Sequence, residues 1–226
     1  MEFSDKKLLI FDLDGTLIDS VPDLANSINH MLISIGRTSF KEADIRLWVG
    51  NGAQTLVKRA LSGGSKIDDT LDAELFKSAL ETFLEHYADN VAVKTHPYAE
   101  VPQTLKELKD AGYTLVIVTN KPYDFVQPIL QSLNLAQYFE DYLGGDSLAT
   151  KKPDPLPLIH ICEKFNVPTD KALMIGDSKN DILAANAANI ESIAVTYGYN
   201  YGEDISSYNP DIVVDSFAEI PKYLNG

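Results

Sequence analysis

Residues 8–17 read LLIFDLDGTL: four apolar residues, then Asp12 and Asp14 one residue apart, then a turn at Gly15. In a parallel sheet, a strand buried on both faces reads as a continuous apolar run, and ligands bind just beyond the carboxyl ends of the strands. The segment therefore predicts a buried strand that delivers two carboxylates to a binding site. Unit charges about 4 Å apart interact by roughly 4 kcal/mol at an effective dielectric near 20, so we expect a divalent cation and an ammonium group beside them.

Strand and helix patterns alternate after residue 97. Short apolar runs predict strands at 114–118, 172–175, 193–195 and 211–214, and residues 138–143 lead into the segment 144–146. Amphipathic or capped segments predict helices at 100–111, 123–133, 156–165, 182–188 and 217–224, the second of them bent near Pro128. Alternating strands and helices with short connections are typical of a mostly parallel sheet with helices on both faces.

The segment from residue 19 to residue 90 carries helix patterns only. Its apolar spacing predicts helices at 20–34, 41–48, 53–61 and 71–88. We therefore expect an α/β protein in which residues 1–18 and 91–226 form a Rossmann-like core domain. Residues 19–90 are expected to form an inserted α-helical cap domain on top of that core.

Composition excludes several classes of partner. The net charge of −14 and the pI near 4.6 argue against nucleic acid and against anionic membranes, because no basic surface offsets the acidic excess. No stretch approaches the roughly 20 apolar residues of a membrane span. The single cysteine, Cys162, cannot form an intrachain disulfide, and the apolar run near the N-terminus is too short for a signal peptide. We expect a cytoplasmic monomer or homodimer that acts on a small metabolite.

Polar residues follow three of the predicted strands. They are Asp12, Asp14 and Thr16 after the first, Thr119, Asn120 and Lys121 after the second, and Asp177, Ser178 and Asp181 after the third. Lys152 lies in a loop between the last two groups. Because the carboxyl ends of parallel strands meet at one edge of the sheet, these segments are expected to converge on one pocket.

In this order, the segments resemble the four motifs of the haloacid dehalogenase superfamily, in the branch with a helical cap after the first motif. The resemblance covers nearly the whole chain. Within the superfamily it is closest to the phosphoglycolate phosphatases, which contain stretches similar to residues 49–53, 151–153, 176–181 and 197–203. The resemblance implies a Mg²⁺-dependent phosphatase.

The first motif suits covalent phosphoryl transfer. Asp12 is the candidate nucleophile, with its second oxygen on Mg²⁺, because an in-line displacement needs an anionic nucleophile beside a cation that neutralises the phosphoryl oxygens. Asp14 would protonate the leaving oxygen and later deprotonate the attacking water, while its backbone carbonyl serves as a metal ligand. Thr16 is expected to hydrogen-bond the Asp14 carboxylate.

The other motifs supply the phosphate site and the rest of the metal site. Thr119 and Asn120 would hold phosphoryl oxygens through a hydroxyl and an amide, and Lys152 would bridge Asp12 and the phosphoryl group. Lys121 is expected to point away from the site by strand alternation.

In the last motif, Asp177 is the expected second carboxylate ligand of Mg²⁺. Asp181 could coordinate through water, hold Lys152 or stabilise a helix N-terminus. Ser178 is a secondary candidate in the same motif.

The cap is expected to close over the site and exclude water. A substrate that carries a carboxylate needs a cation there, and Arg46, Lys58 and Arg59 are the candidates, although each is also typical of an ordinary solvated helix charge. The turn at Gly50, Asn51 and Gly52 could bring backbone N–H groups to the substrate or could simply connect two helices.

The leading hypothesis is a Mg²⁺-dependent phosphomonoester hydrolase that acts through an aspartyl-phosphate, with 2-phosphoglycolate as the substrate. The nearest rival is a sugar phosphomutase similar to β-phosphoglucomutase, which has the same core motifs. A dehalogenase is disfavoured because its chemistry gives Asp14 no leaving alkoxide to protonate. A non-catalytic module that binds a phosphorylated metabolite is the alternative from another class.

Overall fold

The computed structural model describes residues 3–225; residues 1, 2 and 226, which the expected core domain includes, lie outside the described residues. A six-stranded, wholly parallel sheet has the order β6-β5-β2-β7-β8-β9. Its strands are β2 (Leu8–Phe11), β5 (Thr114–Val118), β6 (Asp141–Leu143), β7 (Ala172–Gly176), β8 (Glu191–Val195) and β9 (Ile212–Val214). The expected α/β class and parallel sheet are confirmed.

Strand β2 occupies the centre of the sheet. All four of its residues are buried, as expected for an apolar run with β5 on one side and β7 on the other. Phe11 is in register with Ile117 and Ile175, so the carboxyl ends of the three strands lie at one level. This register brings Asp12 between the ends of β5 and β7.

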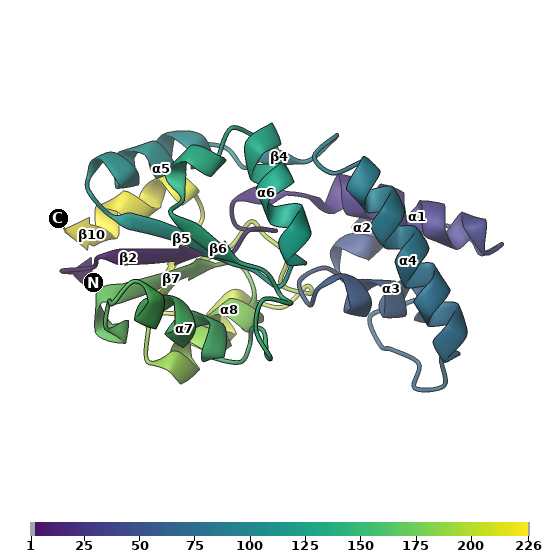
Figure 1. The fold of residues 1–226 in the computed structure, drawn as a ribbon. Helices are drawn as coiled ribbons and strands as arrows, with labels where there is room; N and C mark the ends of the chain where they lie inside the picture. The colour runs from purple at the N-terminus through teal and green to yellow at the C-terminus, as the bar shows by residue number, and fades with distance from the viewer. Residues whose placement is uncertain (1–2, 226) are drawn as a thin grey trace.

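Alternate residues of the strands build two apolar layers. Leu9 and Phe11 pack on the face covered by α5 (Val101–Asp110) and α6 (Tyr123–Ser132). Leu8 and Ile10 pack on the opposite face, with α7 (Leu156–Lys164) and α8 (Lys179–Ala188). The two helix layers lie above and below the sheet in Figure 1. Cys162 is buried on α7, as expected.

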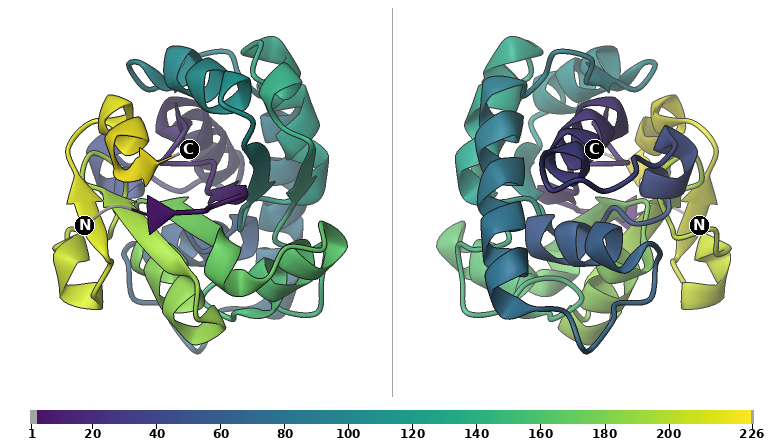
Figure 2. Two further views of the ribbon diagram at one scale, coloured as in Figure 1. Left: turned by 90° about the vertical axis from the view of Figure 1, so that its left-hand side faces the viewer. Right: turned by 90° about the vertical axis from the view of Figure 1, so that its right-hand side faces the viewer.

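Four helices form the cap beyond the carboxyl edge of the sheet (Figures 1 and 2). They are α1 (Val21–Ser34), α2 (Glu42–Arg46), α3 (Ala53–Ser62) and α4 (Ala73–Asp89). The cap has a hydrophobic core of its own, to which Ile28, Met31, Val57 and Phe83 belong. A helical cap over a Rossmann-like core is therefore the observed architecture.

The two chain segments that join the cap to the sheet are paired. Strand β3 (Ile18–Asp19) runs antiparallel to β4 (His96–Pro97). Just inside the cap, the buried Asp23 carboxylate accepts hydrogen bonds from the backbone N–H groups of Lys94 and Thr95 and from the Thr95 hydroxyl. Asp19 thus lies in a short strand, and not in the helical segment where we expected it.

Other elements differ from expectation at their ends. Residues 136–138 form a 3₁₀ helix and residues 141–143 a strand, in a segment to which the sequence assigned no element. Helix α8 begins at Lys179, earlier than expected, because a capping box between Ser178 and Asp181 starts it. Residues 217–223 form a 3₁₀ helix that contains Pro221, which cannot donate a helical hydrogen bond.

The remaining short elements lie at the periphery. Strands β1 (Phe3–Ser4) and β10 (Leu224–Asn225) pair in parallel, and two more 3₁₀ helices span Thr169–Lys171 and Ile205–Tyr208. A search of residues 3–225 finds no helix with the length and apolar character needed to cross a membrane.

Replacing Ile10 with alanine tests the assignment of β2 as the central strand. Ile10 is fully buried, so the Ile10→Ala variant is expected to lose about 2–5 kcal/mol of unfolding free energy through lost burial and a cavity. Ile33 is 65% exposed, and Ile33→Ala is expected to change stability by less than about 0.5 kcal/mol. Urea denaturation measures both, and equal losses in the two variants would contradict the assignment.

Candidate active site

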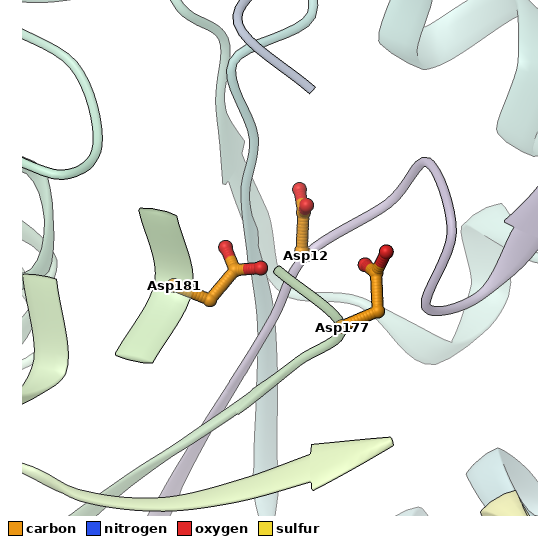
Figure 3. A group of neighbouring side chains, drawn as sticks. All are labelled: Asp12, Asp177 and Asp181. Atoms are coloured by element: carbon orange, nitrogen blue, oxygen red, sulfur yellow. The ribbon is translucent and has the colours of Figure 1, made fainter. Parts of the chain in front are cut away.

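Three carboxylates meet at the carboxyl edge of the sheet. Asp12 follows β2, Asp177 follows β7 and Asp181 lies in the first turn of α8. One oxygen from each lies within 4.8 Å of the others, and all three residues are buried (Figure 3). The convergence expected from the parallel sheet is therefore observed.

A single ammonium group lies within this cluster. Lys152 Nζ is 3.1 Å from Asp12 Oδ1 and 2.6 Å from Asp181 Oδ1, and its side chain is almost completely buried. Three ionised carboxylates against one ammonium leave two negative charges, which a divalent cation would balance. The expected contact between Lys152 and Asp12 is present, and Asp181 holds Lys152 in place.

The pKa values of two of these carboxyl groups are raised. Burial raises the pKa of Asp12 to about 7, because Lys152 only partly offsets the loss of water and the nearby Asp181 carboxylate. Burial, with Asp181 and Asp12, also raises the pKa of Asp177 well above its usual range. Carboxylate oxygens are the ligands that hard divalent cations prefer, so Asp12 and Asp177 fit a metal ion.

Asp177 is held on both of its oxygens. Thr16 donates its hydroxyl to Oδ1 at 2.6 Å, and the Tyr199 backbone N–H donates to Oδ2 at 2.6 Å. A Cβ at position 198 would lie 2.3 Å from Asp177, which explains the glycine there. The expectation that Thr16 binds Asp14 is wrong, because the turn at Gly15, with φ +94°, brings Thr16 against Asp177.

Asp14 binds a different cation from Asp12. Lys121 Nζ lies 3.0 Å from both Asp14 oxygens, and the Ser20 hydroxyl donates to Oδ1 at 2.5 Å. Burial alone lowers the pKa of Lys121, but the Asp14 carboxylate outweighs burial, so the pKa is raised and the ammonium stays charged.

The expectation that Lys121 points away is therefore wrong. Strand alternation ends with β5 at Val118, and the chain then turns, with the Lys121 backbone N–H donating to the Thr119 hydroxyl at 3.2 Å. Side-chain direction beyond that point follows the turn and not the period of the strand. The contact with Asp14 spans 107 residues, so the local sequence pattern carried no signal for it.

Thr119 keeps a hydrogen-bond donor for a phosphoryl oxygen, whereas the side-chain amide of Asn120 does not. The Thr119 hydroxyl lines the cavity and, while accepting from Lys121, keeps its own proton to donate. Asn120 Nδ2 already donates to the Gly50 and Lys152 carbonyls at 3.0 and 2.9 Å. The side-chain amide of Asn120 therefore fastens two loops together, contrary to the expectation that it holds phosphoryl oxygens.

Asp181 and Ser178 form the cap of α8. Asp181 Oδ2 accepts from the Ser178 backbone N–H at 3.0 Å and from its hydroxyl at 2.8 Å, while Oδ1 receives Lys152. Two of the three roles considered for Asp181, holding the lysine and stabilising the helix start, are thus observed. The Ser178 hydroxyl is committed to this cap.

The three cap cations are engaged elsewhere. Arg46 pairs with Asp19 and Glu42 at 3.0 Å each. The Arg59 guanidinium donates at 2.6 Å to a backbone carbonyl of the loop before α3, and Lys58 Nζ lies 4.8 Å from the centroid of an aromatic ring on α4. None of the three lines the cavity described below. Each of the three therefore has a partner of its own here, and a role in binding substrate stays a prediction.

The cap turn is fastened to the core through its carbonyl groups. The Gly50 carbonyl accepts hydrogen bonds from Asn120 and from Asn180, the latter at 3.1 Å. The Asn51 carbonyl accepts from Lys151 Nζ at 2.7 Å. Two carbonyl groups of this turn therefore accept from the core, Asn51 Nδ2 also donates to Asn180 Oδ1 at 3.5 Å, and the sequence did not indicate Asn180 or Lys151 as partners.

A small cavity lies between the cap and the sheet edge. Its volume is about 40 Å³, room for roughly three water molecules. Its polar lining includes Asp12, Asp14, Thr119 and Lys121. Its apolar walls include Leu24, Leu56, Phe83 and Phe125. A wider cleft of about 710 Å³ adjoins it along α3 and α6.

The chain is similar in sequence to known hydrolases. Residues 9–195 match the sequence model of the haloacid dehalogenase-like hydrolases. The chain is 50% identical to a phosphoglycolate phosphatase of Colwellia psychrerythraea over 97% of both chains. It is 49% identical to one of Psychrobacter arcticus over 97% of this chain and 96% of that protein.

Solved structures agree with this similarity. A predicted phosphoglycolate phosphatase from Haemophilus somnus superimposes with a TM-score of 0.91 at 40% identity, covering 96% of this chain and 97% of that chain. The similarity thus extends through the sheet and the cap.

Magnesium is expected to stabilise the folded protein, because the two unbalanced negative charges are buried. At 100 times the dissociation constant the gain is about 2.7 kcal/mol, or about 5–10 °C in Tm for a chain of this length. Differential scanning fluorimetry with MgCl₂ measures the shift. The Asp177→Asn variant is expected to lose it, and Asp170→Asn, at an exposed position, is expected to keep it. An equal shift in both variants would contradict a metal site at Asp177.

Proposed function

The chain belongs to the haloacid dehalogenase-like hydrolases and is a phosphatase, and we propose on that basis that it hydrolyses 2-phosphoglycolate with Mg²⁺ through an aspartyl-phosphate on Asp12. The observation that carries the proposal is the buried cluster in which Asp12 lies beside Lys152 and Asp177. This arrangement pairs an anionic nucleophile with a fixed ammonium and with oxygen ligands for a cation.

Asp12 and Lys152 act on the phosphoryl group. A free Asp12 oxygen attacks phosphorus in line with the leaving oxygen, and Lys152, 3.1 Å from Asp12, neutralises charge on the phosphoryl oxygens. The Thr119 hydroxyl donates to one of those oxygens. Mg²⁺, held by the carboxylates of Asp12 and Asp177 and by the Asp14 carbonyl, would supply further neutralising charge.

Asp14 moves the proton in both half-reactions. It lies in the same cavity as Asp12 and is held by Ser20 and Lys121. It enters the reaction in its protonated form and gives that proton to the glycolate oxygen as the ester bond breaks; the resulting carboxylate, paired with Lys121, then recovers a proton from the water that hydrolyses the aspartyl-phosphate. The products are glycolate, inorganic phosphate and the free Asp12 carboxylate.

Binding and catalysis would involve two domains. We propose the boundaries expected from the sequence, a core of residues 1–18 and 91–226 and a cap of residues 19–90. The paired strands β3 and β4 join them, and the cap turn closes onto Asn120 and Lys151. Closure excludes bulk water from the acyl-phosphate until the leaving group has departed.

The narrow cavity beside Asp12 favours a short leaving group. Its volume of about 40 Å³ is less than a whole substrate needs, so a substrate must enlarge it or extend into the adjoining cleft, and the hexose of a sugar phosphomutase would require this to a far greater extent than a two-carbon group. The relatives named above as phosphoglycolate phosphatases support the same substrate. The presence of every charged group needed for transfer disfavours a non-catalytic binding module.

Phosphate release from a panel of esters tests the proposal. We expect 2-phosphoglycolate to give the highest kcat/KM among phosphoglycolate, hexose phosphates, nucleoside monophosphates and pyrophosphate, with activity lost in EDTA and restored by MgCl₂. Because Asp12 is the nucleophile, Asp12→Asn is expected to lower kcat by at least about 1,000-fold. Asp170→Asn serves as the exposed control. Activity that survives Asp12→Asn, or a hexose phosphate as the best substrate, would contradict the proposal.

A further inference from the structure

We propose that Lys121 and Tyr87 form a subsite that recognises a carboxylate on the leaving group and so determines substrate choice. The inference rests on the proposed phosphatase function and extends it. It names the residues that would distinguish a phosphorylated hydroxy acid from a neutral phosphate ester.

Lys121 supplies the positive charge on the leaving-group side of the cavity. Among the described residues that line the cavity, it is the sole cation. Lys152 is not among the lining residues; its ammonium lies between Asp12 and Asp181, on the side of the nucleophile and not of the leaving group. A carboxylate that enters this cavity therefore meets its charge partner at Lys121.

The Lys121 ammonium has one donor that Asp14 does not use. It carries three N–H groups; its two contacts with Asp14 account for two of them, and the Tyr87 hydroxyl lies near enough to help raise the pKa of Lys121. Asp14 is the residue proposed to protonate the leaving oxygen, so Lys121 stands next to the leaving group. In glycolate the carboxylate carbon is two bonds from that oxygen, which keeps the carboxylate within the small cavity beside Lys121.

Tyr87 contributes from the cap. It lies on α4, is 1% exposed and lines the same cavity, and its ring centroid is 4.9 Å from Lys121 Nζ. Its hydroxyl has no hydrogen-bond partner among residues 3–225. Burial raises the pKa of Tyr87 to about 12, so the hydroxyl keeps its proton and can donate it. A buried donor of this kind is satisfied when a ligand brings an acceptor.

The rest of the cavity wall makes the subsite selective. The other side chains of the lining are mostly apolar, and the charged ones among them, Asp12 and Asp14, are acids, so Lys121 alone can pair with a carboxylate. A neutral leaving group would leave the spare Lys121 donor and the Tyr87 hydroxyl unpaired in a water-excluded space. Sites built from such donors reject analogues that lack the matching acceptor far more strongly than apolar pockets reject small changes of size.

A matched pair of substrates tests the subsite. We compare kcat/KM for 2-phosphoglycolate with kcat/KM for its amide, which has nearly the same size but no charge on the leaving group. The ratio of the two values is measured for the wild type, Lys121→Met, Tyr87→Phe and the control Lys58→Met. Lys58 is a cap lysine that lines neither the cavity nor the adjoining cleft.

The wild type is expected to prefer the acid, and Lys121→Met is expected to reduce that preference about 10- to 100-fold, since a hydrogen bond to a charged group is lost. Tyr87→Phe is expected to reduce it about 3- to 10-fold with no fall in Tm, because the variant removes only a hydroxyl that lacks a partner. Lys58→Met is expected to leave the ratio unchanged.

The results that would overturn the subsite differ from the result that would overturn the proposed substrate. If both substrates lose activity equally in Lys121→Met and the ratio is unchanged in Tyr87→Phe, Lys121 only positions Asp14 and the subsite is overturned. A wild type that hydrolyses the acid and the amide equally well overturns the proposed substrate and the subsite with it. A wild-type preference for the acid that persists in both variants overturns the subsite alone.

Discussion

The burial of three carboxylates around one ammonium group is the constraint on which the rest of the site depends. Asp12 and Asp181 share Lys152, Asp177 lies beside them, and the excess negative charge is what makes a divalent cation a stabilising component. The parallel sheet makes this arrangement possible, because its register aligns the ends of β2, β5 and β7. The helical cap then keeps the charged cluster away from bulk water, where its interactions would be weaker.

Much of the core followed from the sequence because its signals are local or topological. An apolar run of strand length predicts a buried strand, and a parallel sheet aligns strand ends wherever the strands lie in the chain. From these two regularities we expected Asp12, Thr119 and Asp177 to lie close together, with Lys152 beside Asp12. The cap helices were predicted from periodicity, with differences of a few residues at their ends.

The predictions from sequence were wrong for side chains that lie beyond the last residue of a strand or helix. Lys121 and Thr16 follow turns, so their directions are set by local backbone geometry and by partners 107 and 161 residues away. Asn120 has the composition of a phosphate ligand, but carbonyls of two loops occupy its amide. Tyr87 lies on a cap helix far from the motifs in sequence, and only the folded cap shows that it lines the cavity with a buried, unpartnered hydroxyl.

Direct detection of a phosphoryl group on Asp12 is the most stringent test of the account. The Asp14→Asn variant keeps the nucleophile but lacks the base for hydrolysis, and p-nitrophenyl phosphate has a leaving group that needs no proton. After acid quench in the presence of Mg²⁺, mass spectrometry of the tryptic peptide spanning residues 8–37 is expected to show one phosphoryl group on Asp12. Release of nitrophenol with no phosphorylated peptide at any quench time, or with the phosphoryl group on another residue, would contradict the account.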